Sequence, residues 1–400
     1  MNRAWRLVAL LSATATASYL CRVNVSVTSV MMMRELGLSQ EAMGRVFSAF
    51  LLGYALCQIP GGMLADRFGA ARVLGWAALA WVAATVWIAG AGAMLPLILA
   101  GRLLLGIAEA PTFPAAARAI AAWIPAPQRG RANGLVIAAI GLGSAIAPPL
   151  LSFVMVRWGW RTALLVSALP ALAAGLAWMK VRAPATAEPA MAASEVKGIP
   201  RSRSFILLTV SYTLQGYVGY IFVYWFFLYL VEVRHFDLMK SALLGSMPWL
   251  LSIVSIPLGG WLHDRLPRRR QLIPMVGLAG SGILIAAGAH TANAWFAVVC
   301  LALATALVLS VEGPFWATMT SIAGPRSGAA GGVMNMGSNL GGFISPALTP
   351  ILASWLGWEA ALLFSGALAV VASVLWIWID PATNQDTGAT SAQIQPATSS

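Results

Sequence analysis

The sequence has little charge for its length. Asp, Glu, Lys and Arg make up only 10% of the 400 residues, whereas 59% are hydrophobic. Soluble domains carry roughly a quarter charged residues, so this composition excludes a water-soluble fold. Stretches of about 20 apolar residues, the length that one membrane-spanning helix needs, recur along the chain. We therefore predict an all-α membrane protein.

Residues for metal or catalytic chemistry are also scarce. The chain has three cysteines and three histidines. Cys21, Cys57 and Cys300 fall in separate apolar stretches, which argues against a disulfide framework and a zinc site. The sequence lacks a phosphate-binding P-loop and a nucleophile elbow. We expect neither an enzyme nor a metal or cofactor, and any transport would draw its energy from an ion gradient.

The hydropathy of the sequence predicts twelve spanning helices. Their expected bounds are 7–30, 41–64, 72–90, 94–123, 131–155, 160–181, 204–230, 239–262, 271–290, 293–320, 327–353 and 357–379.

The basic charge is distributed unevenly between the predicted loops. Of 25 Lys and Arg residues, sixteen fall on the side that carries the termini, six on the other side and three inside helices. An excess of Lys and Arg in cytoplasmic loops is typical of membrane proteins, so both termini are predicted to be cytoplasmic. The net charge of +12 then indicates topology and contact with membrane lipid, not a nucleic-acid partner.

The second half of the chain repeats the first after a shift of 198 residues. GGMLADR at 61–67 aligns with GGWLHDR at 259–265, GWRTALL at 159–165 with GWEAALL at 357–363, and, at a slightly larger offset, EAPTF at 109–113 with EGPFW at 312–316. Such duplication predicts two parallel six-helix repeats. The expected organisation is a first half (1–181), a cytoplasmic linker (182–203), a second half (204–380) and a disordered tail (381–400).

Several short motifs resemble those of known transporters. GGMLADRFG (61–69) and GRLLLG (101–106) are similar to motifs of the major facilitator superfamily. Within it, YLCRVNVSV (19–27), EAPTFPA (109–115), YWFFLYL (224–230) and NMGSNLGG (335–342) resemble the anion:cation symporter family. That family includes sialin, the vesicular glutamate transporters, and bacterial hexuronate and galactonate carriers. The resemblance implies a monomeric carrier of the bacterial inner membrane that takes up a small organic anion with protons.

The sequence departs from the bacterial members of that family at one position. They usually have Asp just before the arginine of the first helix, where this chain has Cys21. One expected proton-carrying group is therefore missing, so the stoichiometry and the choice between protons and sodium stay open.

Charged residues inside the predicted spans are the candidate functional groups, because burying them in a membrane is costly. The planar guanidinium of Arg22 matches a carboxylate with two hydrogen bonds, and Tyr19 and Ser26 lie on the same helix face. Arg22 is predicted to anchor the substrate. The alternative is a tie between helices, neutralised by Glu109.

Glu109 is the predicted proton carrier, as the resemblance also implies. Desolvation and a nearby cation act in opposite directions on a carboxyl group, so Glu109 beside an arginine that exchanges partners would change protonation. The alternative is a permanent salt bridge. Arg102, seven residues earlier, would tune Glu109 or tie helices. Glu312, at the repeated position, would be a second proton site or a gating contact.

Other candidates are assigned from residue type and resemblance. Tyr54, Tyr224 and Asn335 would contact the substrate, although helix packing is the alternative for Asn335. Trp316 would line the cavity, or would anchor the chain at the membrane interface.

Charged residues at helix–loop junctions on the cytoplasmic side are expected to latch the halves together in the outward-facing state. These gating candidates are Asp66, Arg67, Arg72, Asp264 and Arg265.

The sequence thus predicts a secondary active transporter that imports a small carboxylate, with sugar acids among the candidates, by proton symport and alternating access. An exchanger or exporter of organic anions is the alternative. A membrane receptor that senses its ligand without net transport is the more remote one.

Overall fold

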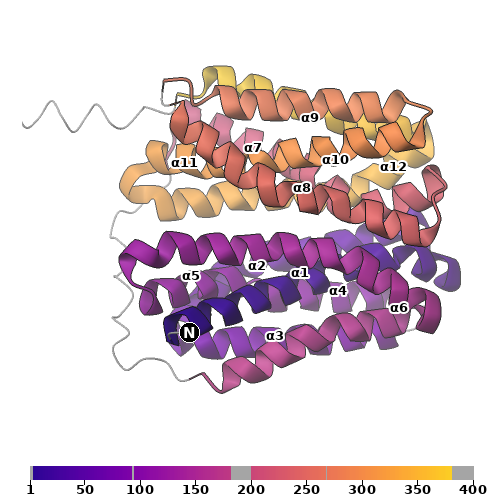
Figure 1. Cartoon of the computed structure of the whole chain (residues 1–400), viewed down its shortest axis with the longest axis horizontal. Coiled ribbons are helices and arrows are strands. Elements are labelled where there is room, and N and C mark those ends of the chain that lie inside the picture. The colour runs from indigo at the N-terminus through magenta and orange to yellow at the C-terminus, as the bar shows by residue number, and fades with distance from the viewer. Residues whose placement is uncertain (1–2, 92–93, 182–199, 267, 381–400) are drawn as a thin grey trace, which may run out of the picture.

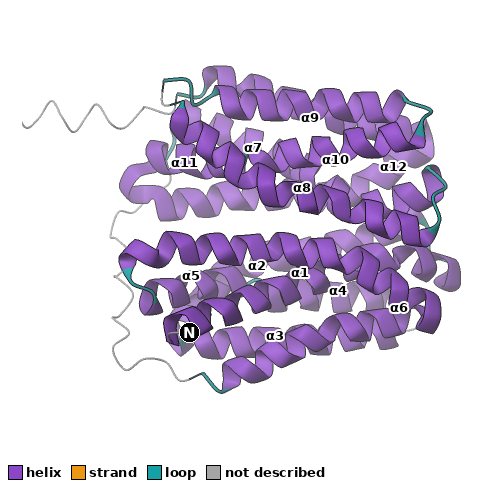
Figure 2. Cartoon of the chain, in the orientation of Figure 1, coloured by secondary structure: helices purple, strands orange, loops and turns teal. Residues whose placement is uncertain are grey.

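The computed structural model describes residues 3–91, 94–181, 200–266 and 268–380. Every regular element in this part of the chain is a helix (Figure 2). The helices run along one common direction, and the two halves of the sequence form two adjacent bundles (Figure 1). The predicted tail and most of the predicted linker lie outside the described residues.

The first half contains six helices and a short 3-10 turn. They are α1 (Arg3–Leu36), α2 (Gln40–Phe68), α3 (Ala70–Gly90), α4 (Leu95–Glu109), α5 (Thr112–Trp123), η1 (Ala126–Gln128) and α6 (Arg129–Met179). The second half repeats this order. It comprises α7 (Arg203–Leu228), η2 (Tyr229–Val233), α8 (Leu238–Arg265), α9 (Leu272–His290), α10 (Ala294–Ser310), α11 (Glu312–Ala323), η3 (Gly324–Arg326), α12 (Ser327–Leu375) and η4 (Trp376–Trp378).

Two of the helices are long enough to cross a membrane twice. α6 breaks at Gly159 (φ 81°, ψ 165°) and α12 breaks at Gly357 (φ 86°, ψ 160°). This region of backbone conformation is essentially restricted to glycine. The two glycines are 198 residues apart, as the internal repeat predicts. In the described part of the chain nine helical segments are long and apolar enough to span a membrane, with α4–α5 and α10–α11 each counted as one. Counting α6 and α12 twice gives eleven, and α1, which has 34 residues but is less apolar, completes the predicted twelve.

Each half also contains one interrupted span, and an acidic residue lies at each interruption. α4 ends at Glu109, just before Pro111, and α11 begins at Glu312, just before Pro314. Proline removes a backbone donor and clashes with the preceding turn, so the chain reorients at these positions. The predicted continuous helices 94–123 and 293–320 are therefore each divided in two.

Glycines let the spans approach closely. A Cβ atom on Gly106 of α4 would clash with the backbone carbonyl of Phe50 on α2, and one on Gly53 of α2 would clash with the carbonyl of Leu103. Lipid tails are as apolar as the side chains, so spanning helices associate mainly through such close packing and hydrogen bonds. This contact fixes α2 against α4 beside Glu109.

Contacts between the two halves concentrate in the part of the bundle that lies away from the termini. Ser26 donates to the carbonyls of Val223 (3.0 Å) and Tyr224 (2.9 Å), and Ser48 donates to the carbonyl of Phe343 (2.7 Å). Arg34 pairs with Glu232 (2.7 Å). Phe47 stacks on Tyr224 with 4.8 Å between the ring centroids. We call this set of contacts the seam. The halves are thus joined at the end opposite the termini.

Candidate substrate site

A buried ion pair joins α1 to α4 in the first half. Arg22 Nη2 and Nε donate to Oε1 of Glu109 at 2.7 Å and 3.1 Å. The side chains are 3% and 0% exposed, respectively. The pair brings together the two residues to which the sequence assigned anion binding and proton transfer. The two side chains therefore interact directly.

Aromatic rings enclose the guanidinium of Arg22. Its Cζ atom lies 4.5 Å from the ring centroids of Tyr19 and Tyr54 and 5.1 Å from that of Phe50. Nη1 also donates to the Tyr19 hydroxyl at 3.2 Å. Desolvated cation–π contacts of this kind contribute about 2 kcal/mol or more. They orient the planar group so that its edge, which donates to Glu109 in this structure, faces a carboxylate.

The two oxygens of Glu109 have different surroundings. Oε1 accepts from Arg22 and from the hydroxyl of Ser18 at 2.6 Å. Oε2 is buried and has no hydrogen-bond partner among the described residues. A buried carboxylate oxygen without a donor is unfavourable. The two oxygens of Glu109 are therefore not equivalent.

Arg102 is buried near this pair but is not hydrogen-bonded. Its side chain on α4 is 0% exposed, and none of its three guanidinium nitrogens has a hydrogen-bond partner in the described part of the chain. Its Cζ lies 4.8 Å from the centroid of Phe50. Such a contact contributes about 2 kcal/mol when desolvated, less than the roughly 3–5 kcal/mol cost of leaving a buried charge without its partner. The ring therefore does not offset the burial of this charge.

A second polar cluster surrounds Glu312 in the second half. Tyr212 Oη donates to Oε2 of Glu312 at 2.7 Å, and Gln215 Nε2 donates to Oε1 at 3.1 Å. Trp316 Nε1 donates to the Tyr212 hydroxyl at 3.2 Å. No Lys or Arg pairs with Glu312 among the salt bridges of the described residues. The repeated acid thus has neutral partners where Glu109 has an arginine.

The other predicted substrate residues divide between the site and the halves' interface. Tyr54 lies on Arg22, as described above. Ser26 and Tyr224 belong to the seam, where Tyr224 is fully buried and stacks on Phe47. Asn335 on α12 donates to Gln58 on α2 at 2.7 Å. This conformation therefore uses Ser26 and Asn335 to join the halves.

The predicted gating residues do not join the halves in this conformation. Asp66 pairs with Arg118 of α5, within the first half. Arg67 lies over the ring of Phe68, and Arg265 lies over that of Trp261. Arg72 and Asp264 are exposed at the same end of the bundle. The predicted latch would form in another state, and it stays a prediction.

Some contributors to the site were missed from the sequence. They are Ser18, Phe50, Gln58, Tyr212 and Gln215. Ser18 is one helical turn before Arg22, a spacing that places both on one face and that could have identified it. The others come from different helices, and their sequence positions carry no comparable signal.

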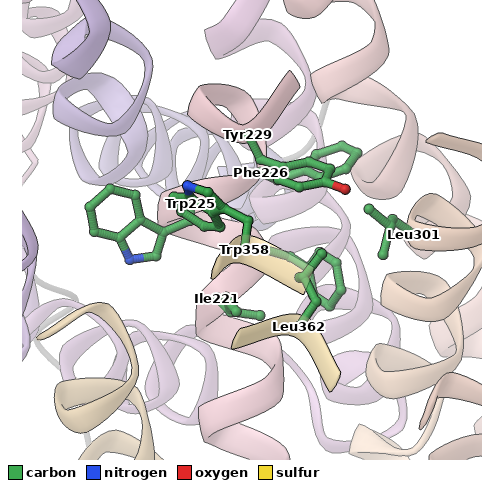
Figure 3. Close-up of a pocket in the computed structure, with 8 residues that line it drawn as sticks. Ile221, Trp225, Phe226, Tyr229, Leu301, Trp358 and Leu362 are labelled. Carbon is green, nitrogen blue, oxygen red and sulfur yellow. The ribbon is translucent and has the colours of Figure 1, made fainter. Parts of the chain in front are cut away.

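A small pocket in the second half is unsuited to an anion. It has a volume of about 10 Å³, close to the minimum for one water molecule, and is lined mainly by aromatic and aliphatic side chains, including Trp225, Trp358 and Leu301 (Figure 3). Lys, Arg and His are absent from its described lining. The charged candidates therefore lie elsewhere, at Arg22 and Arg102.

Comparison with known proteins agrees with this architecture. The family model described as Major Facilitator Superfamily matches residues 10–346 and 317–399. A probable sulfoacetate transporter of Cupriavidus necator is 34% identical over 395 residues, which cover 91% of each chain. A probable galactarate/D-glucarate transporter of Escherichia coli K12 is 30% identical and covers 90% of this chain and 91% of its own.

Solved structures show the same fold at low sequence identity. A bacterial homologue of the human lysosomal transporter Spinster superimposes with a TM-score of 0.81 at 18% identity, covering 95% of this chain and 97% of its own. The D-xylose–proton symporter superimposes with a TM-score of 0.78 at 16% identity, covering 94% and 98%.

The chain belongs to the Major Facilitator Superfamily, and it is a multi-pass membrane transporter, not an enzyme. The resemblance to the anion:cation symporter family is confirmed by the sulfoacetate and galactarate/D-glucarate relatives and by a D-galactonate transporter of Escherichia coli O6:H1, which is 28% identical and covers 91% of this chain and 92% of its own.

Proposed function

We propose that the protein imports a small organic anion together with protons across the bacterial inner membrane. The observation that carries the proposal is the buried pair of Arg22 and Glu109. One member matches a carboxylate geometrically, and the other carries a proton when it is neutral. The names of the relatives, which include transporters of sulfoacetate, galactarate/D-glucarate and D-galactonate, support a substrate with an acidic group.

The coupling follows from competition for one guanidinium. In this structure Glu109 occupies two donors of Arg22. A substrate carboxylate that takes these donors leaves Glu109 ionised and buried without its cation, which is costly. A proton on Glu109 removes that cost. Substrate and proton thus favour the same loaded state, and this shared preference is the basis of coupling.

The direction of the cycle rests on the orientation of the chain. We take the termini to lie in the cytoplasm because the basic loops are on that side. The seam then faces outward. Substrate would enter when the seam separates, and would leave toward the cytoplasm after the seam has formed again.

Glu312 is proposed as a second protonation site. Its two oxygens accept from Tyr212 and Gln215, and the part of the chain described offers it no salt bridge. A buried acid without a cation favours its neutral form. In this role Glu312 compensates for the missing acid at Cys21. The driving ion is the proton, no cofactor is needed, and the transporting unit is a monomer in contact with lipid.

Uptake into proteoliposomes under an imposed pH gradient tests the proposal. The substrates are radiolabelled sulfoacetate, galactarate and galactonate, offered to wild type, Glu109→Gln and Glu359→Gln. Glu359 is a half-exposed acid that pairs with His290 and serves as the matched control. We expect wild type and Glu359→Gln to accumulate at least one of these acids.

Glu109→Gln separates coupling from binding. Its amide mimics the neutral carboxyl, so the variant should exchange internal for external substrate without accumulating it. Accumulation equal to that of wild type would remove Glu109 from the coupling mechanism. Accumulation that follows a sodium gradient and ignores the pH gradient would replace the proton as the driving ion.

A further inference from the structure

The unpaired guanidinium of Arg102 is the feature from which we infer more about the substrate. Arg22, Arg102 and Glu109 are the charged side chains that are buried in the described first half. Glu109 hydrogen bonds to Arg22, and Arg102 makes no hydrogen bond with a described residue. This centre therefore has one more positive than negative charge, and two more when Glu109 is protonated.

Polar groups without partners lie around Arg102. The Tyr224 hydroxyl is close enough to interact with the guanidinium, although it does not reach hydrogen-bond geometry, and it is itself buried without a partner. Cys21 is fully buried within electrostatic range of Arg102, and its thiol donates to the carbonyl of Ser167 at 3.4 Å. Beside the thiol lies the hydroxyl of Thr85, another buried group without a hydrogen-bond partner among those described. An anion at Arg102 would meet the Tyr224 hydroxyl and no carboxylate at position 21.

We propose that Arg102 binds a second acidic group of the substrate while Arg22 binds the first, so that the transported anion is a short dianion. The inference rests on the proposed function, because it assumes a carboxylate on Arg22. Nothing in the comparisons assigns Arg102 this role.

The separation of the two arginines limits the size of the dianion. Their Cζ atoms lie 5.1 Å and 4.8 Å from the centroid of the same ring, that of Phe50. Both are cation–π contacts, and the two atoms cannot be farther apart than these distances combined, roughly 10 Å. Charge-assisted hydrogen bonds of about 2.8 Å at each end leave only a few covalent bonds between the acidic groups.

The charge balance favours the same class of substrate. When Glu109 is protonated, two guanidinium charges remain in the centre, and a dianion cancels both. A monoanion leaves one buried positive charge without a partner, which is costly in a membrane interior. With a dianion bound, the centre formed by Arg22, Arg102 and protonated Glu109 has no net charge, so the two halves can enclose it with the smallest desolvation cost.

The second half of the chain controls access to Arg102. Tyr224 comes from α7 and lies against Arg102. The ring of Phe47, on α2, stacks on the ring of Tyr224 at an interplanar angle of 18°. Separation of the halves at the seam would move Tyr224 away and expose Arg102. The subsite would therefore fill from the end of the bundle opposite the termini.

The test compares acids that differ by one acidic group. Binding of sulfoacetate and acetate, and of galactarate and galactonate, is measured by calorimetry on the full purified chain. We expect wild type to bind the dianion of at least one pair at least tenfold more tightly than the monoanion. Arg102→Gln should lower this ratio at least tenfold.

Substitutions of Cys21 provide an independent test if Arg102→Gln does not fold. Cys21→Asp places an acid beside Arg102, which would occupy the subsite and lower the ratio at least tenfold. Cys21→Ser is the matched neutral control and should keep the wild-type ratio. A ratio that is unchanged in both Arg102→Gln and Cys21→Asp would overturn the proposal.

The remaining outcomes separate the two proposals and the source of the anion. If wild type binds monoanions as tightly as dianions, Arg102 is not a substrate subsite, and the proposed function stands. If wild type binds and transports none of the acids, the proposed function itself fails. If raising the chloride concentration weakens dianion binding only when Arg102 is present, a free anion competes for the same subsite. If chloride instead strengthens monoanion binding through Arg102, the subsite belongs to a free anion, and the dianion proposal is wrong.

Discussion

Replacing Arg22 by lysine removes geometry while keeping charge. The guanidinium donates through Nε and Nη2 to one carboxylate and through Nη1 to Tyr19. Lysine presents a compact ammonium that cannot reproduce this planar fork. The substitution therefore tests whether two-point recognition of a carboxylate, and not positive charge alone, is what the site requires.

The expected loss corresponds to about one charge-assisted hydrogen bond. Such a bond contributes about 1.5–3 kcal/mol, and each 1.4 kcal/mol is a factor of ten. Arg22→Lys should therefore lower initial uptake at subsaturating substrate by roughly 10- to 100-fold. Partial loss of stacking on the three rings adds to the effect in the same direction.

The assay is initial-rate uptake into proteoliposomes, with thermal unfolding measured on the same preparations. Arg161→Lys is the matched control, because Arg161 forms a half-exposed pair with Glu35. Exposed pairs contribute at most about 1 kcal/mol, so this variant should stay within a few-fold of wild type. Uptake by a folded Arg22→Lys carrier within threefold of wild type would refute two-point recognition.

Three further predictions concern packing, backbone and the seam. Gly106→Ala should cost about 1–3 kcal/mol of stability through overpacking and lower the melting temperature, whereas Gly219→Ala, whose added Cβ meets nothing within 4 Å, should not. Gly357→Ala should lower the free energy of unfolding by about 1–3 kcal/mol, because the backbone conformation of Gly357 is essentially restricted to glycine. A smaller loss of stability in thermal unfolding would show that the break relaxes into a continuous helix. Arg34→Glu should shift the halves toward separation by up to about 1 kcal/mol, and Arg34→Glu combined with Glu232→Arg should restore the wild-type distances between spin labels on the two halves. Unchanged distances in the single variant would show that this ion pair does not hold the seam.

The number and order of the spans could be read from the sequence, because the bilayer imposes a strong local rule. Each span must be a long apolar helix whose backbone groups bond internally, and this requirement leaves its signal in consecutive residues. The duplication at 198 residues also predicted that the breaks at Gly159 and Gly357 would correspond. The positions of the helix ends, and of the interruptions at Pro111 and Pro314, were predicted less accurately than the spans themselves, because local propensity competes there with packing.

Arg22 and Glu109 were identifiable one by one for the same reason. A charged residue in an apolar stretch is costly, so its presence alone indicates a role. Their partnership was only one of the alternatives that the sequence allowed. The distance of 2.7 Å between them depends on how α1 and α4 pack.

Only the tertiary structure decided which polar groups share the site. Residues from distant parts of the chain meet there: Phe50 lies under both arginines, and Asn335 meets Gln58 across the two halves. It also placed Ser26 and Tyr224 in the seam. Above all, it left the guanidinium of Arg102 without a hydrogen-bond partner among the described residues, a property that depends on the space around a residue and not on its position in a helix. The sequence by itself determined the spans and their charged residues because hydrophobicity is local, whereas pairing across helices is set by three-dimensional packing.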